Sequence, residues 1–517
     1  MEWLLENRTR LLTLGILIVL FLLAISGMPA EEWVITALRG LALGALTFLV
    51  AAGLSIIFGL MDVLNLAHGE LFMLGAYVGW TIYVRPDTVI DGATPFLLIA
   101  SLLVLVPLLT RWVRSLTLPD LVDKIWPWVG LAAGIGLLVF ALFQYPLSTW
   151  DLENYAQSPI SNAIAFETGT FQSPPPAEFE ASPVLVIGGV IVGSGLLALA
   201  AAGFSARQTT LRQPSPTQMR NIAIVSGGLF ALAFVVLAIN NTLTEFMLGL
   251  GSTPRFFIAM ALASVTGALL GWTIEVTMIR PLYDRPIYQI MLTLGLGFII
   301  LELVRAVWGR PEFQMPRPAV FAGTGEGCPA TSIGDLVQYQ CATIEVLGGR
   351  VRMYNEVFII IVGLLVLGAV ALLLQRTRLG MIIRAGVQDS EMVEALGINV
   401  RQVFSQVVAL GVGLAALGGV LAGPSLGLSN GMGARVLLLA LIALAVGGLT
   451  SFSGAAAGAV LIGLLQQFII KYGQIGINVP FMAEPFKPSP PLVPASSVLL
   501  MVVILLILPQ GLFGRKE

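Results

Sequence analysis

The stretch GLSIIFGLMDVLNLAHGELFMLGAYV (residues 53–78) joins two apolar runs through a short polar break. The break contains Asn65, His68 and Glu70, and His68 is the only histidine in a chain of 517 residues. A helix needs about 20 mostly apolar residues to cross a bilayer. The two runs extend outward to residues 36–58 and 66–84, so the stretch predicts two membrane-spanning helices joined by a polar turn.

The composition of the whole chain points in the same direction. Hydrophobic residues make up 57% of the chain and charged residues only 11%, whereas soluble domains carry roughly 25% charged residues. The 56 glycines suit membrane helices that pack closely against one another. A net charge of −2 gives no indication of a nucleic-acid partner. The composition therefore predicts an all-α polytopic membrane protein in a lipid bilayer.

Apolar runs recur along the chain and predict about 14 transmembrane segments. These are residues 11–28, 36–58, 66–84, 96–113, 126–146, 184–204, 221–239, 256–279, 288–308, 355–375, 403–428, 435–450, 455–471 and 493–509. The first run follows two arginines and precedes small residues, which is compatible with a cleaved signal peptide. Its length favours a retained first helix.

Lysine and arginine are unevenly distributed when these segments alternate from an inside N-terminus. The inside segments then hold Arg8, Arg10, Arg111, Arg114, Lys124, Arg207, Arg212, Arg220, Arg280, Arg285, Arg376, Arg378, Arg384, Arg401, Arg515 and Lys516. The long outside segment 147–183 has neither lysine nor arginine. Because cytoplasmic loops carry an excess of both residues, the pattern predicts that both termini are cytoplasmic.

Segment 309–354 falls outside and holds both cysteines, Cys328 and Cys341. An oxidising compartment permits a disulfide between them, although the sequence is equally compatible with two free thiols. Shortly afterwards, TIEVLGGRVRMY (residues 343–354) alternates β-forming residues around Gly348 and Gly349, which predicts a small hairpin. Such a hairpin would receive a soluble partner or cap the helix bundle.

The inside segment QRTRLGMIIRAGVQDSEMVEALGINVRQVF (residues 375–404) contains the short predicted helix DSEMVEALG (residues 389–397). Asp389 or Ser390 would cap its N-terminus and Gly397 would end it. Acidic Glu391 and Glu394 suit its first turn. The apolar side chains on it, Met392, Val393 and Leu396 with Ile398 beyond, have no membrane span to enter. They predict docking onto another protein, with a helix lying on the bilayer surface as the alternative.

Motifs for catalysis and cofactor binding are absent from the sequence. No glycine precedes any of the four lysines, so there is no P-loop. A single histidine and no C-x-x-C motif argue against zinc or a haem held by two histidines. In GAAAG (residues 454–458), alanine occupies the serine position of a G-x-S-x-G elbow. We therefore expect no catalytic residues, no metal, no cofactor and no enzyme activity in this chain.

Ionisable residues inside spans suggest a transport function, because each costs roughly 2.5–3.5 kcal/mol at a helix centre. Besides His68 and Glu70, they are Glu275, Glu302 and Arg305. The last two are three residues apart, share a helix face and could pair. An ion-coupled secondary carrier would usually hold more acids or histidines in mid-span, and a channel or scaffold is a further alternative.

Five stretches carry a family resemblance: residues 53–78, 274–297 (IEVTMIRPLYDRPIYQIMLTLGLG), 378–403, 445–463 (AVGGLTSFSGAAAGAVLIG) and 508–515 (LPQGLFGR). In this order they resemble the LivH-type permeases of bacterial branched-chain amino acid ABC importers. The chain is longer than typical members. It divides into an N-terminal core part (1–95), an inserted segment with four predicted spans (96–240), and a C-terminal core part (241–517) with a docking loop at 376–402.

The resemblance implies the membrane-spanning subunit of an importer in the bacterial plasma membrane. Its partners would be a second permease, two cytoplasmic ATP-binding subunits and an extracytoplasmic substrate-binding protein. Branched-chain amino acids are the implied substrates, and urea or short amides are alternatives within the same family. The loop between Arg384 and Arg401 matches the family's ATPase-contacting loop. This adds Arg384 to the docking candidates Asp389, Glu391, Met392, Glu394, Leu396 and Gly397.

The polar break remains the second candidate site. Asn65, His68 and Glu70 could hydrogen-bond the backbone groups that a helix break exposes, and Gly69 could allow an unusual backbone angle. The alternative is direct contact with a transported substrate. Under the first interpretation, the residues shape a turn beside the inner end of the pathway.

Overall fold

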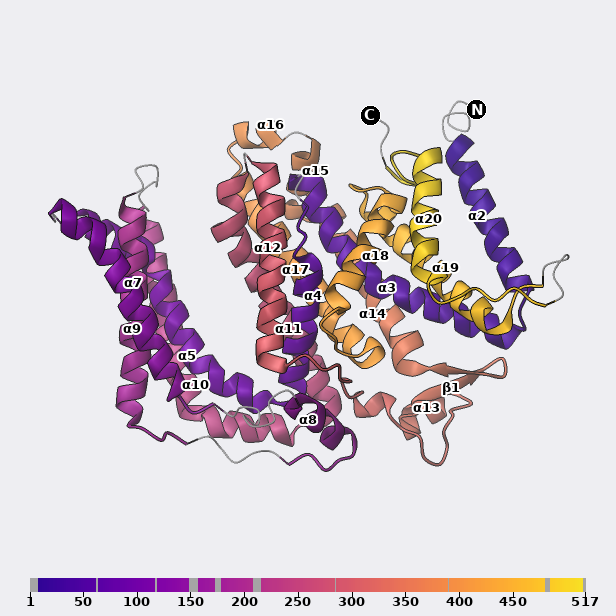
Figure 1. Ribbon diagram of the computed structural model, residues 1–517, viewed down its shortest axis with the longest axis horizontal. Helices are drawn as coiled ribbons and strands as arrows, with labels where there is room; N and C mark the ends of the chain where they lie inside the picture. The colour runs from indigo at the N-terminus through magenta and orange to yellow at the C-terminus, as the bar shows by residue number, and fades with distance from the viewer. Residues whose placement is uncertain are drawn as a thin grey trace. The chain divides into compact units, whose positions relative to one another are not determined.

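The structure is a computed structural model that describes residues 8–61, 64–116, 119–147, 157–172, 178–207, 215–283, 285–388, 390–478 and 484–514. Helices dominate it (Figure 1). Those that coincide with the predicted runs are α2 (Arg8–Ser26), α3 (Ala30–Met61), α4 (His68–Val84), α5 (Pro86–Val104) with α6 (Val106–Arg114), α7 (Asp120–Phe143), α9 (Pro183–Ala206), α10 (Pro216–Gly249), α11 (Ser252–Ile274), α12 (Pro286–Trp308), α14 (Ile359–Arg376), α17 (Val400–Leu426), α18 (Met432–Gly447), α19 (Phe452–Ile475) and α20 (Leu492–Ile507).

Among the described residues, 11 helices are long and apolar enough to cross a membrane. Helices α4, α18 and α20 are shorter, at 17, 16 and 16 residues. The remaining helical elements are α8 (Ser158–Glu167), η1 (Glu275–Ile279), η2 (Arg280–Leu282), η3 (Ala319–Phe321), α13 (Ile333–Tyr339), η4 (Met353–Phe358), α15 (Arg378–Gln388) and α16 (Ser390–Ala395). The predicted class, an all-α polytopic membrane protein, is confirmed, with one small hairpin added.

The chain forms two compact units, which are described separately. The first comprises Met1–Tyr83, Asn154–Thr170 and Ser252–Glu517, and the second comprises Val84–Glu153 and Phe171–Gly251. The predicted insertion, residues 96–240, overlaps the second unit but differs from it at both ends. It also differs in the middle, because α8 packs with the first unit: the Phe166 ring lies 5.0 Å from that of Tyr83 and 5.2 Å from the Arg255 guanidinium.

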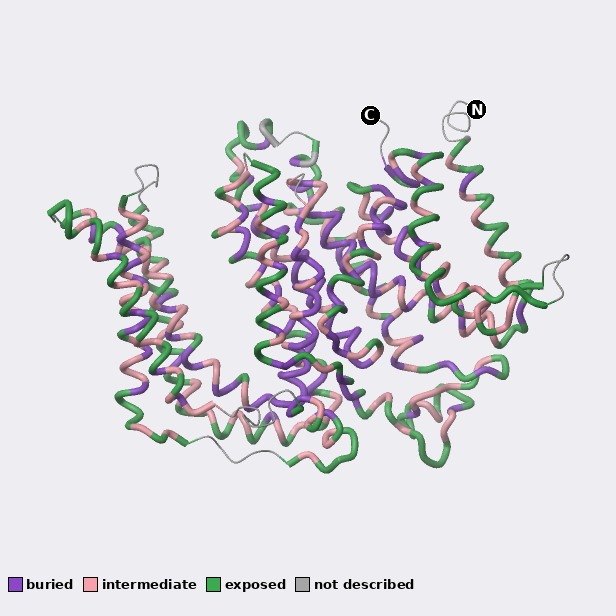
Figure 2. Tube along the Cα trace, viewed as in Figure 1, coloured by how far each residue is buried: buried purple, intermediate pink, exposed green. Residues whose placement is uncertain are grey.

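Helices α3 and α17 form the centre of the first unit. The most apolar stretch of each is 78% buried, whereas that of every other described candidate span is at most 44% buried (Figure 2). Helix α3 packs against α17, α18, α19 and α14, and α11 packs along α17. Small residues allow the close approach: a Cβ at Gly44 of α3 would lie 2.9 Å from the Cα of Val460 in α19.

The second unit is built from α5, α7, α9 and α10, with α6 against α9. Its apolar core contains Leu98, Ala141, Val190 and Ala233, one from each of the four long helices. Helix α5 begins at Pro86, ten residues before the predicted span. Proline and an acid suit a first helical turn, and here the buried Asp87 carboxylate also pairs with Arg85 at 2.7 Å.

The predicted hairpin is present in the first unit. Strands β1 (Thr343–Val346) and β2 (Gly349–Arg352) pair antiparallel, with Val346 opposite Gly349. The two residues of the turn, Leu347 and Gly348, both have positive φ angles, as a primed turn requires. The turn is thus centred one residue earlier than the Gly-Gly pair. Cys341, just before β1, is joined by a disulfide to Cys328, with the two Cα atoms 5.5 Å apart.

Candidate functional site

The polar break lies between the end of α3 at Met61 and the start of α4 at His68. Asn65 Oδ1 accepts a hydrogen bond from the Ala67 amide at 3.0 Å, and the His68 amide donates to the Asn65 carbonyl at 3.2 Å. The Leu66 amide donates to Oγ1 of the buried Thr293 in α12, at 3.3 Å. Polar groups therefore satisfy backbone donors where the helical pattern is interrupted.

Several polar atoms at the break are buried without a hydrogen-bond partner among the described residues. They are Asn65 Nδ2, both ring nitrogens of His68, and Glu70 Oε2. The Val50 carbonyl of α3 lies near the His68 ring but outside hydrogen-bond geometry. Leaving a buried polar group unpaired costs about 1–3 kcal/mol. Four such atoms within six residues mark this region as a functional candidate.

Gly69 does not have the predicted unusual backbone angle. It lies in the first turn of α4 with a helical conformation, and it is not among the glycines with positive φ. Its small size is what the packing requires, because a Cβ there would lie 2.6 Å from the Leu437 Cβ and would press on the Gly433 carbonyl oxygen of α18. Glycine is thus needed at this position because it permits the close approach of α4 and α18, not because of its backbone angle.

The second candidate site is the predicted docking loop, which forms α15 and α16. Helix α16 ends in a Schellman motif, because the Gly397 amide donates to the Glu394 carbonyl at 2.9 Å and the Ile398 amide donates to the Val393 carbonyl at 3.4 Å. Gly397 has a φ of +82°, which favours glycine. The end of the predicted helix is therefore where the sequence placed it.

The side chains of α16 divide into a buried anchor and exposed apolar groups. Val393 is buried, whereas Met392 is 58% and Leu396 is 73% exposed. These two exposed residues are four apart and share one helix face. Glu394 is also exposed. Asp389 and the Glu391 side chain lie outside the described residues.

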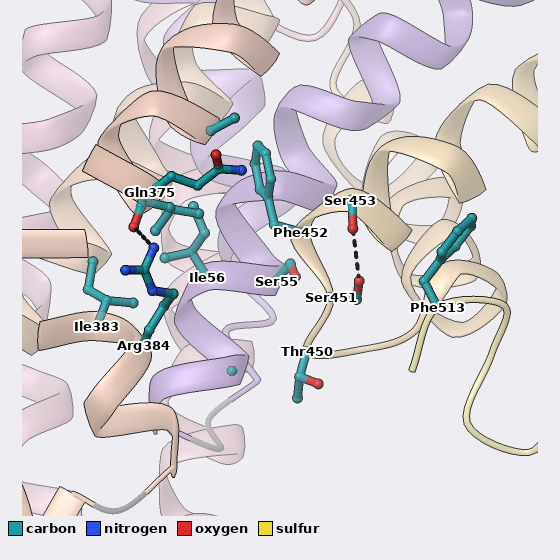
Figure 3. A pocket seen from close by; sticks show the side chains of 13 residues that line it. Ser55, Ile56, Gln375, Ile383, Arg384, Thr450, Ser451, Phe452, Ser453 and Phe513 are labelled. Carbon is teal, nitrogen blue, oxygen red and sulfur yellow. Dashed lines mark hydrogen bonds between the residues drawn. The ribbon is translucent and has the colours of Figure 1, made fainter. Parts of the chain in front are cut away.

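Arg384 lies in α15 on the wall of a cavity of about 380 Å³ (Figure 3). Its Nη1 donates to the Leu374 carbonyl near the end of α14, where a cation also interacts favourably with the helix dipole. Ser451 lies on the opposite wall and caps α19 by accepting from the Gly454 amide at 3.1 Å. Arg384 therefore connects the start of the docking loop to the end of α14, while α16 carries the exposed apolar face of the loop.

Sequence reasoning missed an ion pair between the exposed Arg39 of α3 and the buried Glu356 of η4. Arg39 Nε donates to Glu356 Oε1 at 2.7 Å, and the Arg352 amide donates to Glu356 Oε2 at 2.6 Å. Glu356 is only 1% exposed. Arg39 lies near the start of the predicted span 36–58, and Glu356 lies near the start of the predicted span 355–375. A charge on an apolar helix is the signal that would have identified them.

The other ionisable candidates are paired within the first unit. Glu302 and Arg305 form the ion pair that their spacing predicted, at 2.5 Å. Glu275 is fully buried, with Arg280 at 2.9 Å and the Tyr283 hydroxyl as further partner. Arg280 also donates to the Ser405 hydroxyl of α17 at 2.5 Å. The Arg280–Ser405 bond connects η2 to α17, and among the described residues the polar break is where four unpaired buried polar atoms lie within six residues.

Comparisons with known proteins identify the family to which the chain belongs. The family model described as the permease component of branched-chain amino acid transport systems matches residues 36–202 and 215–508. The high-affinity branched-chain amino acid transport system permease protein BraD of Pseudomonas aeruginosa is 27% identical over 274 residues, 52% of this chain and 79% of BraD. The corresponding LivH protein of Escherichia coli K12 is 24% identical over 257 residues, 49% of this chain and 73% of LivH.

The permease protein LivH of Salmonella typhimurium is 23% identical, with the same coverage of both chains as its Escherichia coli counterpart. No solved structure matches the chain significantly. The relatives confirm the resemblance that the five sequence stretches indicated. Because the family match covers most of its length, this chain belongs to the family of branched-chain amino acid transport system permeases.

Proposed function

We propose that the chain is the membrane-spanning permease subunit of an ABC importer that moves branched-chain amino acids, driven by separate ATPase subunits. The observation that carries this proposal is the family match over residues 36–202 and 215–508. The relatives are named as permease proteins of high-affinity branched-chain amino acid transport systems. A second permease chain would complete the translocation pathway, and a substrate-binding protein would deliver the amino acid from outside.

Helix α16 is the proposed contact with an ATPase. Its exposed Met392 and Leu396 would enter an apolar groove, as helices do in helix-in-groove recognition. Helix α16 packs on α15 and α17, and α15 packs on α3. A displacement of α16 would therefore reach the two central helices of the first unit.

These central helices connect the docking loop to the polar break. A Cβ at Gly53 of α3 would lie 2.6 Å from the Gly411 carbonyl oxygen of α17 and 2.9 Å from Nε2 of His68. Movement of α3 against α17 would thus change the surroundings of His68 and its neighbours. We propose that the break, with Asn65, His68 and Glu70, forms part of the inner end of the pathway.

The proposed orientation places both termini and α16 in the cytoplasm of a bacterium. It follows from the excess of arginine and lysine on one side of the predicted spans. The segment with the hairpin and the Cys328–Cys341 disulfide then faces outward, where an oxidising compartment maintains disulfides. This is the face that would receive the substrate-binding protein.

The docking role is tested by Leu396→Asp in the complex reconstituted in proteoliposomes with its ATPases and binding protein. A carboxylate in an apolar groove is costly to desolvate, so we expect ATP-driven L-leucine uptake to fall at least ten-fold while membrane insertion is unchanged. Leu121→Asp is the matched control, because Leu121 is 70% exposed at the start of α7, outside the predicted docking loop.

Two outcomes would contradict the proposal. If the Leu396→Asp variant takes up leucine at the wild-type rate and co-purifies with the ATPases at the normal yield, α16 is excluded as the docking helix. ATP-driven uptake of urea or a short amide in place of leucine, isoleucine and valine would refute the substrate assignment while leaving the importer role.

A further inference from the structure

A second cavity in the first unit, of about 260 Å³, lies far from the docking loop. Its walls come from α3, the end of β2, η4, α17 and α19. Arg39 lines it and is 22 residues before Met61 on α3, which is about 33 Å along a helix. The Met61 end of α3 approaches α15, since a Cβ at Gly386 would lie 2.9 Å from the Leu60 Cδ1. The cavity therefore belongs to the opposite end of α3.

The disulfide-bearing segment lies at this same end. A Cβ at Gly349, in the hairpin, would lie 2.7 Å from Cδ1 of Ile35 in the first turns of α3. The π-helical turn η4, which forms part of the cavity wall, directly follows β2. In the proposed orientation, the cavity is thus at the end of the bundle where substrate arrives.

The charges in this cavity leave one positive charge uncompensated. The described residues that line it include two arginines, Arg39 and Arg352, and a single acid, Glu356. Arg39 is 46% exposed at its side chain even though its Nε binds Glu356. Guanidinium groups bind carboxylates through several donors in a fixed geometry. The excess charge therefore favours a ligand with a carboxylate.

The same cavity also offers acceptors and an apolar wall. Asn355 Oδ1 is buried and has no hydrogen-bond partner among the described residues, and it lies beside Glu356 in a π-helical turn, a feature frequent at functional sites. Leu43 and Leu46 follow Arg39 by four and seven residues, on one face of α3. An ammonium group would find acceptors here, and an aliphatic side chain would find an apolar surface.

We infer that this cavity is a substrate site within the permease itself, and that it takes an α-amino acid with an aliphatic side chain. Arg39 and Arg352 hold the α-carboxylate, and the oxygens of Asn355 and Glu356 accept from the ammonium group. This inference rests on the proposed function and assigns the place where the permease recognises its substrate.

The Arg39–Glu356 ion pair allows such a ligand to enter without leaving the buried Glu356 carboxylate unpaired. A bound zwitterion replaces the Arg39–Glu356 contact with two new ones, so that Glu356 retains a cationic partner throughout. Leaving the buried Glu356 carboxylate without a cationic partner would otherwise be strongly unfavourable. The cavity beside Arg384 offers an arginine and hydroxyl groups but no carboxylate among its described lining residues. It therefore lacks the charged acceptor that an ammonium group favours.

The test is binding of radiolabelled L-leucine to the purified full-length chain in detergent, without the binding protein. We expect saturable binding by the wild type and at least ten-fold weaker binding by Arg39→Gln and Arg352→Gln. Leucinamide, which lacks the carboxylate, and 4-methylpentanoate, which lacks the ammonium group, should compete poorly. Arg207→Gln is the matched control, because Arg207 belongs to the second unit, where it pairs with Asp123 at 3.9 Å.

Arg39→Gln breaks the ion pair with Glu356 and could prevent folding. Arg352→Gln keeps the test decisive in that case, because the Arg352 side chain is exposed and its backbone amide still donates to Glu356. No leucine binding by the wild type, or unchanged binding by Arg352→Gln, would overturn the site. Leucine uptake by the complete transporter is measured separately. Uptake with an unchanged KM in Arg352→Gln rejects the site and retains the proposed function, whereas leucine binding without any ATP-driven uptake rejects only the proposed function.

Discussion

Glycines make room for the polar break at the scale of single residues. A Cβ at Gly53 would lie 2.9 Å from His68 Nε2, and one at Gly433 would lie 2.6 Å from the Gly69 carbonyl and 2.7 Å from Glu70 Oε2. Contacts this short are incompatible with a side chain unless the helices move apart. The arrangement of His68 and Glu70 therefore depends on the glycines around them as much as on the polar residues themselves.

Gly69→Val should abolish transport and destabilise the protein, because overpacking a close contact costs about 1–3 kcal/mol. His68→Gln should retain much of the uptake, because it keeps a polar side chain and creates no clash. The measurements are leucine uptake in proteoliposomes and the Tm of the purified protein. Gly295→Val is the control for valine in a helix, because a Cβ at Gly295 meets nothing within 4 Å. Equal effects of the two valine variants would refute the packing argument.

Single residues were predictable where the partner is close in sequence. Glu302 and Arg305 lie three apart on one helix, and Gly397 follows the last apolar residue of a short helix. The Arg39–Glu356 pair was missed because its members are 317 residues apart, and only the fold brings α3 against η4. For Gly69 the residue was identified but its role was wrong, since a sequence does not show which helix will approach.

At the scale of helices, apolar runs marked the spans but not their ends. Helix α3 extends from Ala30 to Met61 around a predicted span of 36–58, and α10 extends from Pro216 to Gly249 around 221–239. The apolar run of a span ends where the bilayer ends, whereas the backbone hydrogen bonds of the helix continue beyond it until a capping residue ends the helix. Helix α10 begins in this way with a capping box formed by Ser215 and Gln218.

The segment before the hairpin is closed by the disulfide and by backbone bonds, including Gly323 to Gln340 at 2.9 Å and Ala330 to Thr343 at 3.0 Å. We expect no labelling of Cys328 or Cys341 by maleimide in the unfolded, unreduced protein, and labelling of both after reduction. Reduction should also make residues 319–354 more sensitive to protease, because closing a loop of this size contributes roughly 3 kcal/mol. Two labelled thiols without reductant would contradict the bridge.

At the scale of the whole molecule, the second unit holds an even number of predicted crossings. Its candidate spans are Pro86–Arg114, Asp120–Phe143, Pro183–Ala206 and Pro216–Gly249. If all four cross, the chain returns to the side from which it started, and the first unit keeps one orientation before and after the second. The apolar runs predict this parity. The return of α8 to the first unit was not, because it depends on ring contacts of Phe166 that no local pattern reveals.

The orientation of both units can be tested with introduced cysteines, because the disulfide removes the two native thiols from the background. Leu347→Cys in the hairpin turn should react with a membrane-impermeant maleimide in spheroplasts. Leu396→Cys in α16 and Leu121→Cys in α7 should react only after permeabilisation. All three leucines are well exposed, at 66%, 73% and 70%, so exposure of the side chain does not limit the reaction.

The pattern of labelling separates two ways in which this topology can fail. If Leu347→Cys is protected and the other two variants react in intact spheroplasts, the whole chain is inverted, and α16 cannot meet a cytoplasmic ATPase. If only Leu121→Cys changes sides, α5 with α6 does not cross as one span, and the assignment of four crossings to the second unit is wrong. Arginine and lysine gather on the same proposed face in both units, so we expect the two units to report one common orientation.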